Sequence, residues 1–153
     1  MTAKAVQAAM LIRRPPGEVF AAFVNPQTLR KFWLANASGP LGPGARVQWD
    51  FMVPGASARV VVTRFEAPHF LSFDWPGMRV EMTFEAFGDD GTRCAVALSG
   101  FESADAITQA AGAIEGFAVV LCDLKTLLET GESAHLVRDK AELIIAAQAA
   151  RGG

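Results

Sequence analysis

The side chains best suited to catalysis or metal binding are few and widely spaced in this sequence. His69 and His135 are the two histidines, and Cys94 and Cys122 are the two cysteines. Nucleophilic hydrolysis needs a nucleophile, a base within hydrogen-bond reach and a group that orients the base. A structural zinc site needs about four such ligands at short spacings. These four residues satisfy neither pattern, so we predict no catalytic residue, no metal site and no cofactor.

Two carboxylates could still act together. Glu81 and Glu85 alternate with Val80, Met82 and Phe84, so they share one face of a predicted strand. They could form an acid and base pair. They could equally lie on a solvated sheet face, where a cross-strand partner such as Arg93 or Arg59 would pair with them. The alternation favours the solvated face.

Large apolar side chains are the more informative group, because they exceed what a small closed core requires. Gly112 and Gly116 lie one helical turn apart and would leave a notch beside them. Tyrosine is absent, so indole N–H groups are among the polar anchors left for a ligand. Each large residue could simply be core, but as a group they predict a ligand pocket lined by Trp33, Trp49, Phe51, Phe73, Trp75, Met82, Phe84, Phe117 and Leu121.

One long helix is predicted over residues 103–131. Ser103 could cap its start and Gly131 could end it. The helix is amphipathic, so its apolar face must pack against another part of the chain. That face carries Ile107, Ala111, Ile114, Phe117, Leu121, Leu124 and Leu128.

The cover is predicted from the rest of the chain. Prolines at 15, 16 and 26 separate an opening strand from two short helices, with Asn25 as the cap of the second. Alternating and β-branched segments, bounded by Gly and Pro, then predict further strands. The fold class is therefore α+β, with a curved antiparallel sheet of about six strands wrapped around the long helix; the strands are expected near residues 5–13, 46–51, 58–65, 70–75, 78–87 and 94–98.

Length and charge limit the other possibilities. The 153 residues suit one domain at 1–131, followed by a tail at 132–153 that packs on the domain or is partly flexible. A net charge of −2 gives no general attraction to nucleic acid. The apolar run at 116–122 is too short to span a bilayer, and residues 1–12 lack a signal-peptide pattern. We expect a cytoplasmic protein with no nucleic-acid partner, no membrane insertion and two buried thiols.

Several short motifs resemble one known family. The segments at 16–23 (PGEVFAAF), 25–26 (NP), 116–117 (GF), 120–121 (VL) and 124–131 (LKTLLETG), with Leu29 and Trp33, are similar to the activator of heat-shock-protein ATPase homologue-like branch of the SRPBCC, or START-like, superfamily. The resemblance covers residues 5–131. It implies a helix-grip fold, which commonly encloses a cavity. Many members have tryptophan where this chain has Phe117.

Three functions remain open at this point. The leading hypothesis is binding of a small hydrophobic or amphipathic molecule between sheet and helix, without covalent chemistry. The second is a stress-related or chaperone-associated interaction module, possible as a homodimer, that uses a sheet edge or the tail at 143–145. The third is a cyclase, hydratase or lyase, which the wider superfamily includes. An enzyme would need a polar group deep in the pocket with a perturbed pKa.

Overall fold

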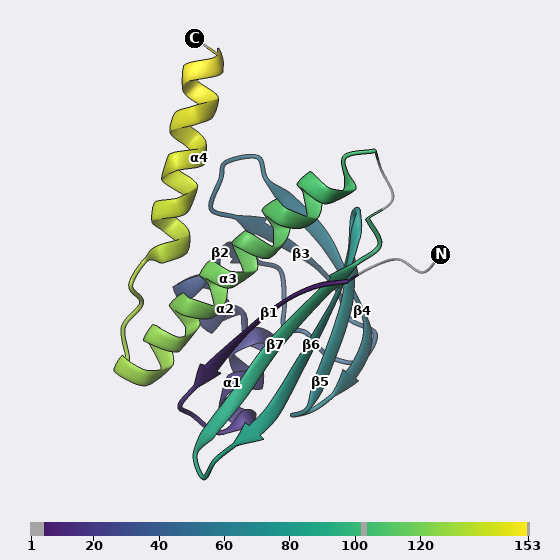
Figure 1. Ribbon diagram of the computed structural model, residues 1–153, viewed down its shortest axis with the longest axis vertical. Coiled ribbons are helices and arrows are strands. Elements are labelled where there is room, and N and C mark those ends of the chain that lie inside the picture. Colours follow the sequence, from purple (N-terminus) through teal and green to yellow (C-terminus); the bar gives the residue numbers. More distant parts are fainter. Residues whose placement is uncertain (1–4, 102–103, 153) are drawn as a thin grey trace.

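A seven-stranded antiparallel sheet forms the body of the protein (Figure 1). The computed structural model describes residues 5–101 and 104–152. The strand order is β1-β7-β6-β5-β4-β3-β2, and one concave face of the sheet holds α3. The elements in chain order are β1 Val6–Ile12, α1 Pro16–Val24, α2 Pro26–Phe32, β2 Leu34–Ala37, β3 Arg46–Phe51, β4 Ser57–Glu66, β5 Phe70–Trp75, β6 Met78–Phe87, β7 Gly91–Ser99, α3 Ala106–Thr130 and α4 Leu136–Gly152.

The predicted α+β helix-grip architecture is confirmed, with one more strand than expected. The additional strand is β2, which pairs with β3 through an irregular register between Leu34 and Asn36. It has only four residues, too few to show a clear alternation in the sequence. Its position after α2 makes it an edge of the sheet.

The alternation on β6 and β7 places one set of side chains in the core and the other in solvent. Glu85 lies opposite Arg93 in the register, and their charged groups are 3.7 Å apart on the exposed face. Arg59 instead lies opposite Gln48 on β3. The solvated interpretation of the two glutamates is therefore confirmed for Glu85. The inner face contributes fully buried Val80, Met82, Phe84, Cys94, Val96 and Leu98.

Helices α1 and α2 close the region at one end of the sheet. Proline occupies the first turn of each, and the Asn25 side chain accepts a 2.9 Å hydrogen bond from the Gln27 backbone N–H, as its capping role predicts. Phe20 packs edge-on against Phe84 with ring centroids 5.1 Å apart. Phe23 makes a similar contact with Phe32 at 5.6 Å. Both helices thus present their aromatic faces to the core.

Helix α3 ends where the sequence predicts. Gly131 has a φ of 88° and its N–H bonds the Leu127 carbonyl at 2.8 Å, a left-handed C-terminal cap. The proposed cap at Ser103 lies outside the described residues. Ile107 was expected to face inward, but this is wrong, because its side chain is 87% exposed. Ala111 is also exposed. Periodicity identifies a helix face but not how far the covering sheet extends along it.

Within the predicted tail, Leu136–Gly152 form helix α4, which packs on α3 only through its first turns. Val137 is half-buried and Ala141 is buried, whereas all described residues after Ala141 are exposed. Asp123 on α3 is 1% exposed and accepts hydrogen bonds from the Ser133 hydroxyl at 2.8 Å and the Ala134 N–H at 3.0 Å. These bonds hold the α3–α4 connection, beyond which α4 projects away from the sheet (Figure 1).

The two thiols differ in environment. Cys94 is buried on β7, and this burial raises the pKa of its thiol to about 12. Cys122 on α3 is only half-buried, so the expectation of two buried thiols is correct for Cys94 and wrong for Cys122. Among the described residues, no helix combines the length and apolarity needed to cross a membrane.

Candidate functional site

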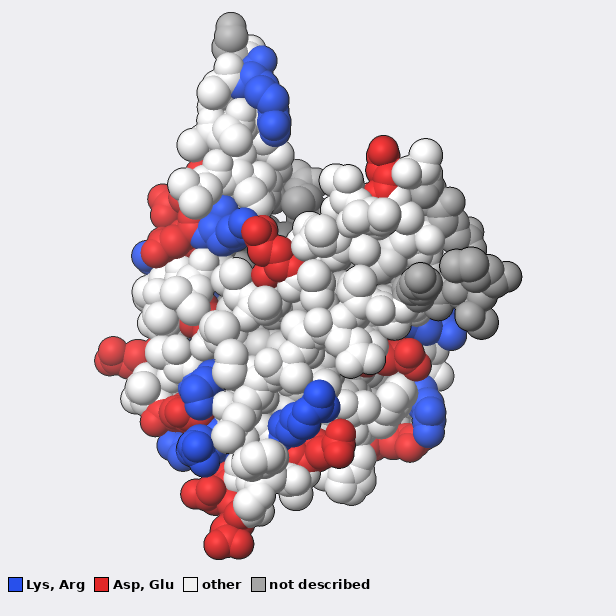
Figure 2. All heavy atoms as spheres, in the orientation of Figure 1, with Lys and Arg blue, Asp and Glu red and all other residues white. Residues whose placement is uncertain are grey.

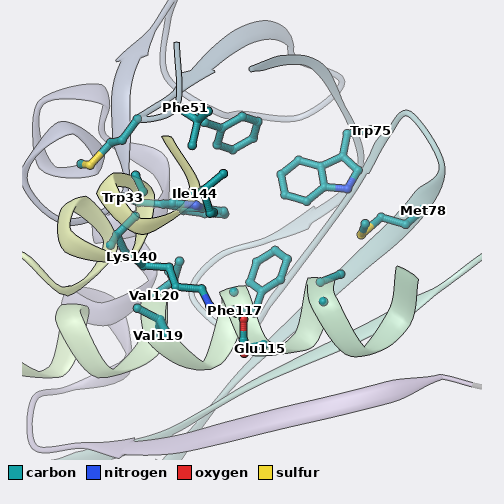
Figure 3. A pocket seen from close by; sticks show the side chains of 17 residues that line it. Trp33, Phe51, Trp75, Met78, Glu115, Phe117, Val119, Val120, Lys140 and Ile144 are labelled. Atoms are coloured by element: carbon teal, nitrogen blue, oxygen red, sulfur yellow. Dashed lines mark hydrogen bonds and ion pairs between the residues drawn. The ribbon is translucent and has the colours of Figure 1, made fainter. Parts of the chain in front are cut away.

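A cavity of about 480 Å³ lies between α3, α4 and one end of the sheet (Figure 3). That volume falls within the range of small-molecule pockets. Three parts of the chain meet there: aromatic residues from the end of α2, from β3 and from β5, the middle of α3, and the first turns of α4. The lining residues are Trp33, Phe51, Met52, Val53, Trp75, Met78, Gly112, Ala113, Glu115, Gly116, Phe117, Val119, Val120, Val137, Lys140, Ala141 and Ile144.

Four aromatic rings form one continuous surface of the cavity. Phe117 on α3 lies at the centre, with ring centroids 5.3 Å from Trp33 and 5.7 Å from Trp75. Phe51 extends the surface, with its ring 5.6 Å from that of Trp75. The Phe117–Trp33 and Phe51–Trp75 contacts are edge-to-face and the Phe117–Trp75 contact is tilted, and such contacts favour defined ring positions. The surface is therefore preformed and can receive a flat apolar molecule.

The wall opposite the sheet is opened by two glycines. A Cβ atom added at Gly112 or Gly116 would meet no heavy atom within 4 Å. Both residues line the cavity, and no neighbouring heavy atom occupies the space beside them. The notch predicted from their spacing is therefore present, and it faces the cavity.

The polar groups of the lining are few and of two kinds. Glu115 on α3 and Lys140 on α4 form an ion pair, with side chains 61% and 37% exposed respectively. Figure 3 shows the Lys140 side chain reaching toward Glu115 beside Phe117. The indole N–H groups of Trp33 and Trp75 have no acceptor among the described residues. Hydrogen-bond donors thus outnumber acceptors in the lining side chains.

Four of the predicted ligand-binding residues come together in the cavity: Trp33, Phe51, Trp75 and Phe117. The other five are at most 1% exposed and lie in the packed core instead: Trp49, Phe73, Met82, Phe84 and Leu121. Trp49 stands directly behind the aromatic surface, with its ring 4.9 Å from that of Trp33. Its indole N–H is buried without a partner among the described residues.

Sequence reasoning missed the contributions of α4, of the turn after β3 and of the first residue of β6. Met52 and Val53 lie in that turn and Met78 begins β6, whereas Val137, Lys140, Ala141 and Ile144 come from α4. Residues in turns carry no periodic signal. The apolar residues near 144 were recognised, but nothing in the sequence indicates which partner they contact. Only packing places Ile144 at the cavity.

The remaining candidates do not assemble into a site. His69 lies in the turn before β5, and His135 precedes α4. Among residues 5–101 and 104–152, no three His, Cys, Asp or Glu side chains are grouped as metal ligands. Figure 2 shows acidic and basic side chains interspersed over the visible face, with no large region of one sign. A second, more open groove runs between α3 and α4 beside Ala118, Cys122 and Leu143.

Together, the gripped helix and the adjoining cavity define the helix-grip class of proteins. The chain belongs to the family described as Activator of Hsp90 ATPase homolog 1-like protein, whose model matches residues 13–129. A search among curated proteins gives no match.

Solved structures share this fold. Protein SSP2350 from Staphylococcus saprophyticus is 25% identical, with a TM-score of 0.76 over 85% of this chain and 95% of that chain. The Aha1 dimer from Colwellia psychrerythraea is 19% identical, with a TM-score of 0.74 over 85% of this chain and 99% of that chain. Protein EF2215 from Enterococcus faecalis is 17% identical, with a TM-score of 0.69 over 96% and 85%.

Proposed function

We propose that this protein binds a small apolar or amphipathic molecule in the cavity between the sheet, α3 and α4, without covalent chemistry. The observation that carries the proposal is the contact of four aromatic rings around a cavity of about 480 Å³. The indole N–H groups of Trp33 and Trp75 have no acceptor within residues 5–101 and 104–152. Neither nitrogen is buried from solvent, so an acceptor on a ligand could replace the water that bonds it. Burial of a ligand would contribute roughly 25 cal/mol per Å² of apolar surface, before entropic costs.

Native mass spectrometry of the full chain, purified from its own host, is the direct test. A reproducible small-molecule adduct that is lost on denaturation would support the proposal and give the ligand's mass. An adduct that is absent from repeated preparations, together with no saturable binding of an apolar dye, would count against it. Phe117→Trp sharpens the test, because the larger ring would reduce the cavity and weaken or change ligand preference.

A steric variant can locate binding within the molecule. Gly116→Leu would fill the cavity, since a side chain at this position extends into its open space. Ala118→Leu is the matched control, because Ala118 lies on the same helix but borders the second groove. Binding that is lost in the first variant and kept in the second would place the ligand at the proposed site. The reverse pattern would transfer it to the groove.

The enzyme alternative has less support from this geometry. The ionisable side chains of the lining, Glu115 and Lys140, pair with each other and are partly exposed. General acid–base catalysis needs a group within hydrogen-bond reach of the reacting atoms, with a pKa suited to its task. An ion pair at the entrance favours recognition over such chemistry.

An interaction module is the second candidate, and the exposed apolar residues of α4 favour it. The side chains of Leu143, Ile144 and Ile145 are 71%, 39% and 36% exposed. A homodimer through α4 would cover them, and burial of such a patch would stabilise it. Light scattering on the full chain and on Leu143→Glu tests this: a dimer that the variant converts to a monomer would support it, and a monomer in both would reject it.

A further inference from the structure

We propose that the cavity takes a flat aromatic molecule carrying one acidic group, and that Lys140 binds this group in place of Glu115. The inference rests on the proposed function and adds the chemical class of the ligand. It depends on three features of the lining: its ring surface, its excess of donors and the unequal exposure of its one ion pair.

The ring surface selects shape. Phe117, Trp33 and Trp75 lie in mutual contact with centroids 5.3 to 6.3 Å apart. Such a surface offers stacking and edge contacts to a planar ring system. The gap at Gly112 and Gly116 leaves room for it against the helix. A flexible aliphatic chain would fill the same volume but lose more conformational entropy on binding.

The donor groups select polarity. The indole N–H groups of Trp33 and Trp75 and the Lys140 ammonium can only donate hydrogen bonds. Against them the lining side chains offer one acceptor, the Glu115 carboxylate. Within the part of the chain that the structure describes, the lining has no Ser, Thr, Asn, Gln, Arg or His. A ligand whose polar atoms are acceptors, such as carboxylate or phenolate oxygens, therefore complements the cavity better than one with amino groups.

The ion pair explains how an anion can enter. The Glu115 side chain is 61% exposed and that of Lys140 is 37% exposed. Glu115 can therefore rotate into water at small cost, while Lys140 remains against the cavity wall. A ligand acid would then form a charge-assisted hydrogen bond with Lys140 that replaces the one to Glu115. With Glu115 solvated, the Glu115 carboxylate, the Lys140 ammonium and the ligand acid together carry a net charge of −1, about one unit more negative than the ion pair alone.

Two fluorescent probes separate the acid from the rings. Anilinonaphthalene sulfonate carries an aromatic ring system and one acidic group, and N-phenylnaphthylamine carries the same rings without the acid. Both would be titrated into the full chain and into Lys140→Gln, Lys140→Arg and Glu115→Gln. Gly116→Leu and Ala118→Leu report whether each probe occupies the cavity or the second groove, because Lys140 borders both.

We expect Lys140→Gln to lower the affinity for the sulfonate probe roughly tenfold, as the loss of one charged hydrogen bond implies. The neutral probe should change less than about twofold, and Lys140→Arg should retain the sulfonate affinity, since both side chains keep the charge. Glu115→Gln should raise the affinity for the sulfonate probe about threefold, because it removes a nearby like charge. Gly116→Leu should abolish the binding of both probes, whereas Ala118→Leu should leave the binding of both unchanged.

Other results would overturn the inference. An equal loss of both probes in Lys140→Gln would mean that Lys140 only holds α4 in place, and unchanged sulfonate binding would mean that it does not contact the acid. In either case the neutral probe could still bind the cavity, and the proposed function would stand. If neither probe binds the unaltered protein saturably, both the proposed function and this inference fail.

Discussion

The two halves of α3 share one amphipathic pattern but differ in what they contact. Between residues 117 and 130 the helix buries Phe117, Val120, Leu121, Asp123, Leu124 and Leu127, whereas between 106 and 116 it buries only Ala110. The second half lies on β1, where Lys125 donates a 2.8 Å hydrogen bond to the Leu11 carbonyl. The first half borders the cavity through Gly112 and Gly116.

The difference shows how one helix can serve both stability and binding. Where the sheet covers α3, each large apolar side chain contributes roughly 1.5–3 kcal/mol by its burial. Where the helix extends past that cover, two glycines remove side chains that would otherwise fill the space. The cavity therefore lies where the two halves of the helix meet, with Gly112 and Gly116 in the less buried half and Phe117 and Val120 in the more buried half.

The largest predicted effect is a core truncation in the second half. Leu124→Ala should lower the free energy of unfolding by about 3 kcal/mol, because Leu124 is 0% exposed and its removal leaves a cavity. Ile107→Ala, in the first half, should change it by less than about 0.5 kcal/mol, since that side chain is 87% exposed. Urea denaturation measures both. Similar losses in the two variants would contradict the division of α3.

The next effect concerns the connection to α4. Asp123→Ala should cost about 2 kcal/mol, because the Ser133 hydroxyl and the Ala134 N–H would lose their buried acceptor. In the variant, amide hydrogen exchange should become faster in α4, and the increase should exceed any increase in the sheet. If α4 keeps its protection in the variant, Asp123 does not hold this connection.

Two glycine substitutions, one in the first half of α3 and one at its C-terminal cap, should change stability in opposite directions. Gly112→Ala should raise the free energy of unfolding by up to about 1 kcal/mol, because alanine favours the helix and its Cβ meets no neighbour. Gly131→Ala should lower it by about 1 kcal/mol or more, because Gly131 has a φ of +88°. Thermal unfolding compares the pair. A destabilised Gly112→Ala would show that this part of α3 is more tightly packed than the structure indicates.

The smallest effect is a pH dependence of stability at Glu129, which joins the end of α3 to the residues that follow β1. The hydrogen bond from Lys125 lowers the pKa of the Glu129 carboxyl, and the Arg13 backbone N–H contributes in the same direction. A lowered pKa stabilises the fold above the ordinary glutamate value and loses that contribution as pH falls through the lowered value. The difference between the protein and Glu129→Gln should be under about 1 kcal/mol at neutral pH.

Acid titration followed by circular dichroism measures this difference. It should be present above the ordinary glutamate pKa and disappear as the pH falls through the lowered pKa of Glu129, where the carboxylate becomes protonated. A difference that stays constant from neutral pH to pH 3 would show that the charge of Glu129 makes no contribution.

Much of the fold could be predicted because it depends on local patterns. The prolines, Asn25 and Gly131 mark helix ends through backbone chemistry that each residue carries with it. Alternation marked the buried face of β6 correctly. Strand β2 was not predicted, because four residues carry too little periodicity, and Ile107 was misplaced because periodicity does not report the extent of the sheet.

The candidate site was predictable only in part, and the reason is the same. Trp33, Phe51, Trp75 and Phe117 line the cavity and Trp49 and Phe73 do not, yet all are large aromatic residues in apolar positions. A residue in a packed core and a residue that borders a cavity show the same residue type and the same periodicity in the sequence. Which of them applies depends on what lies across from each ring.

The sequence by itself determined the α+β class, the helix ends, the inward faces of the strands and the supply of aromatic side chains, because these follow from backbone preferences and short-range periodicity. Only the tertiary structure decided that α4 completes the cavity, that Lys140 meets Glu115 across 25 residues of chain, and that Gly112 and Gly116 open toward the rings. Contacts between distant segments depend on the packing of the whole chain, and no local pattern encodes them.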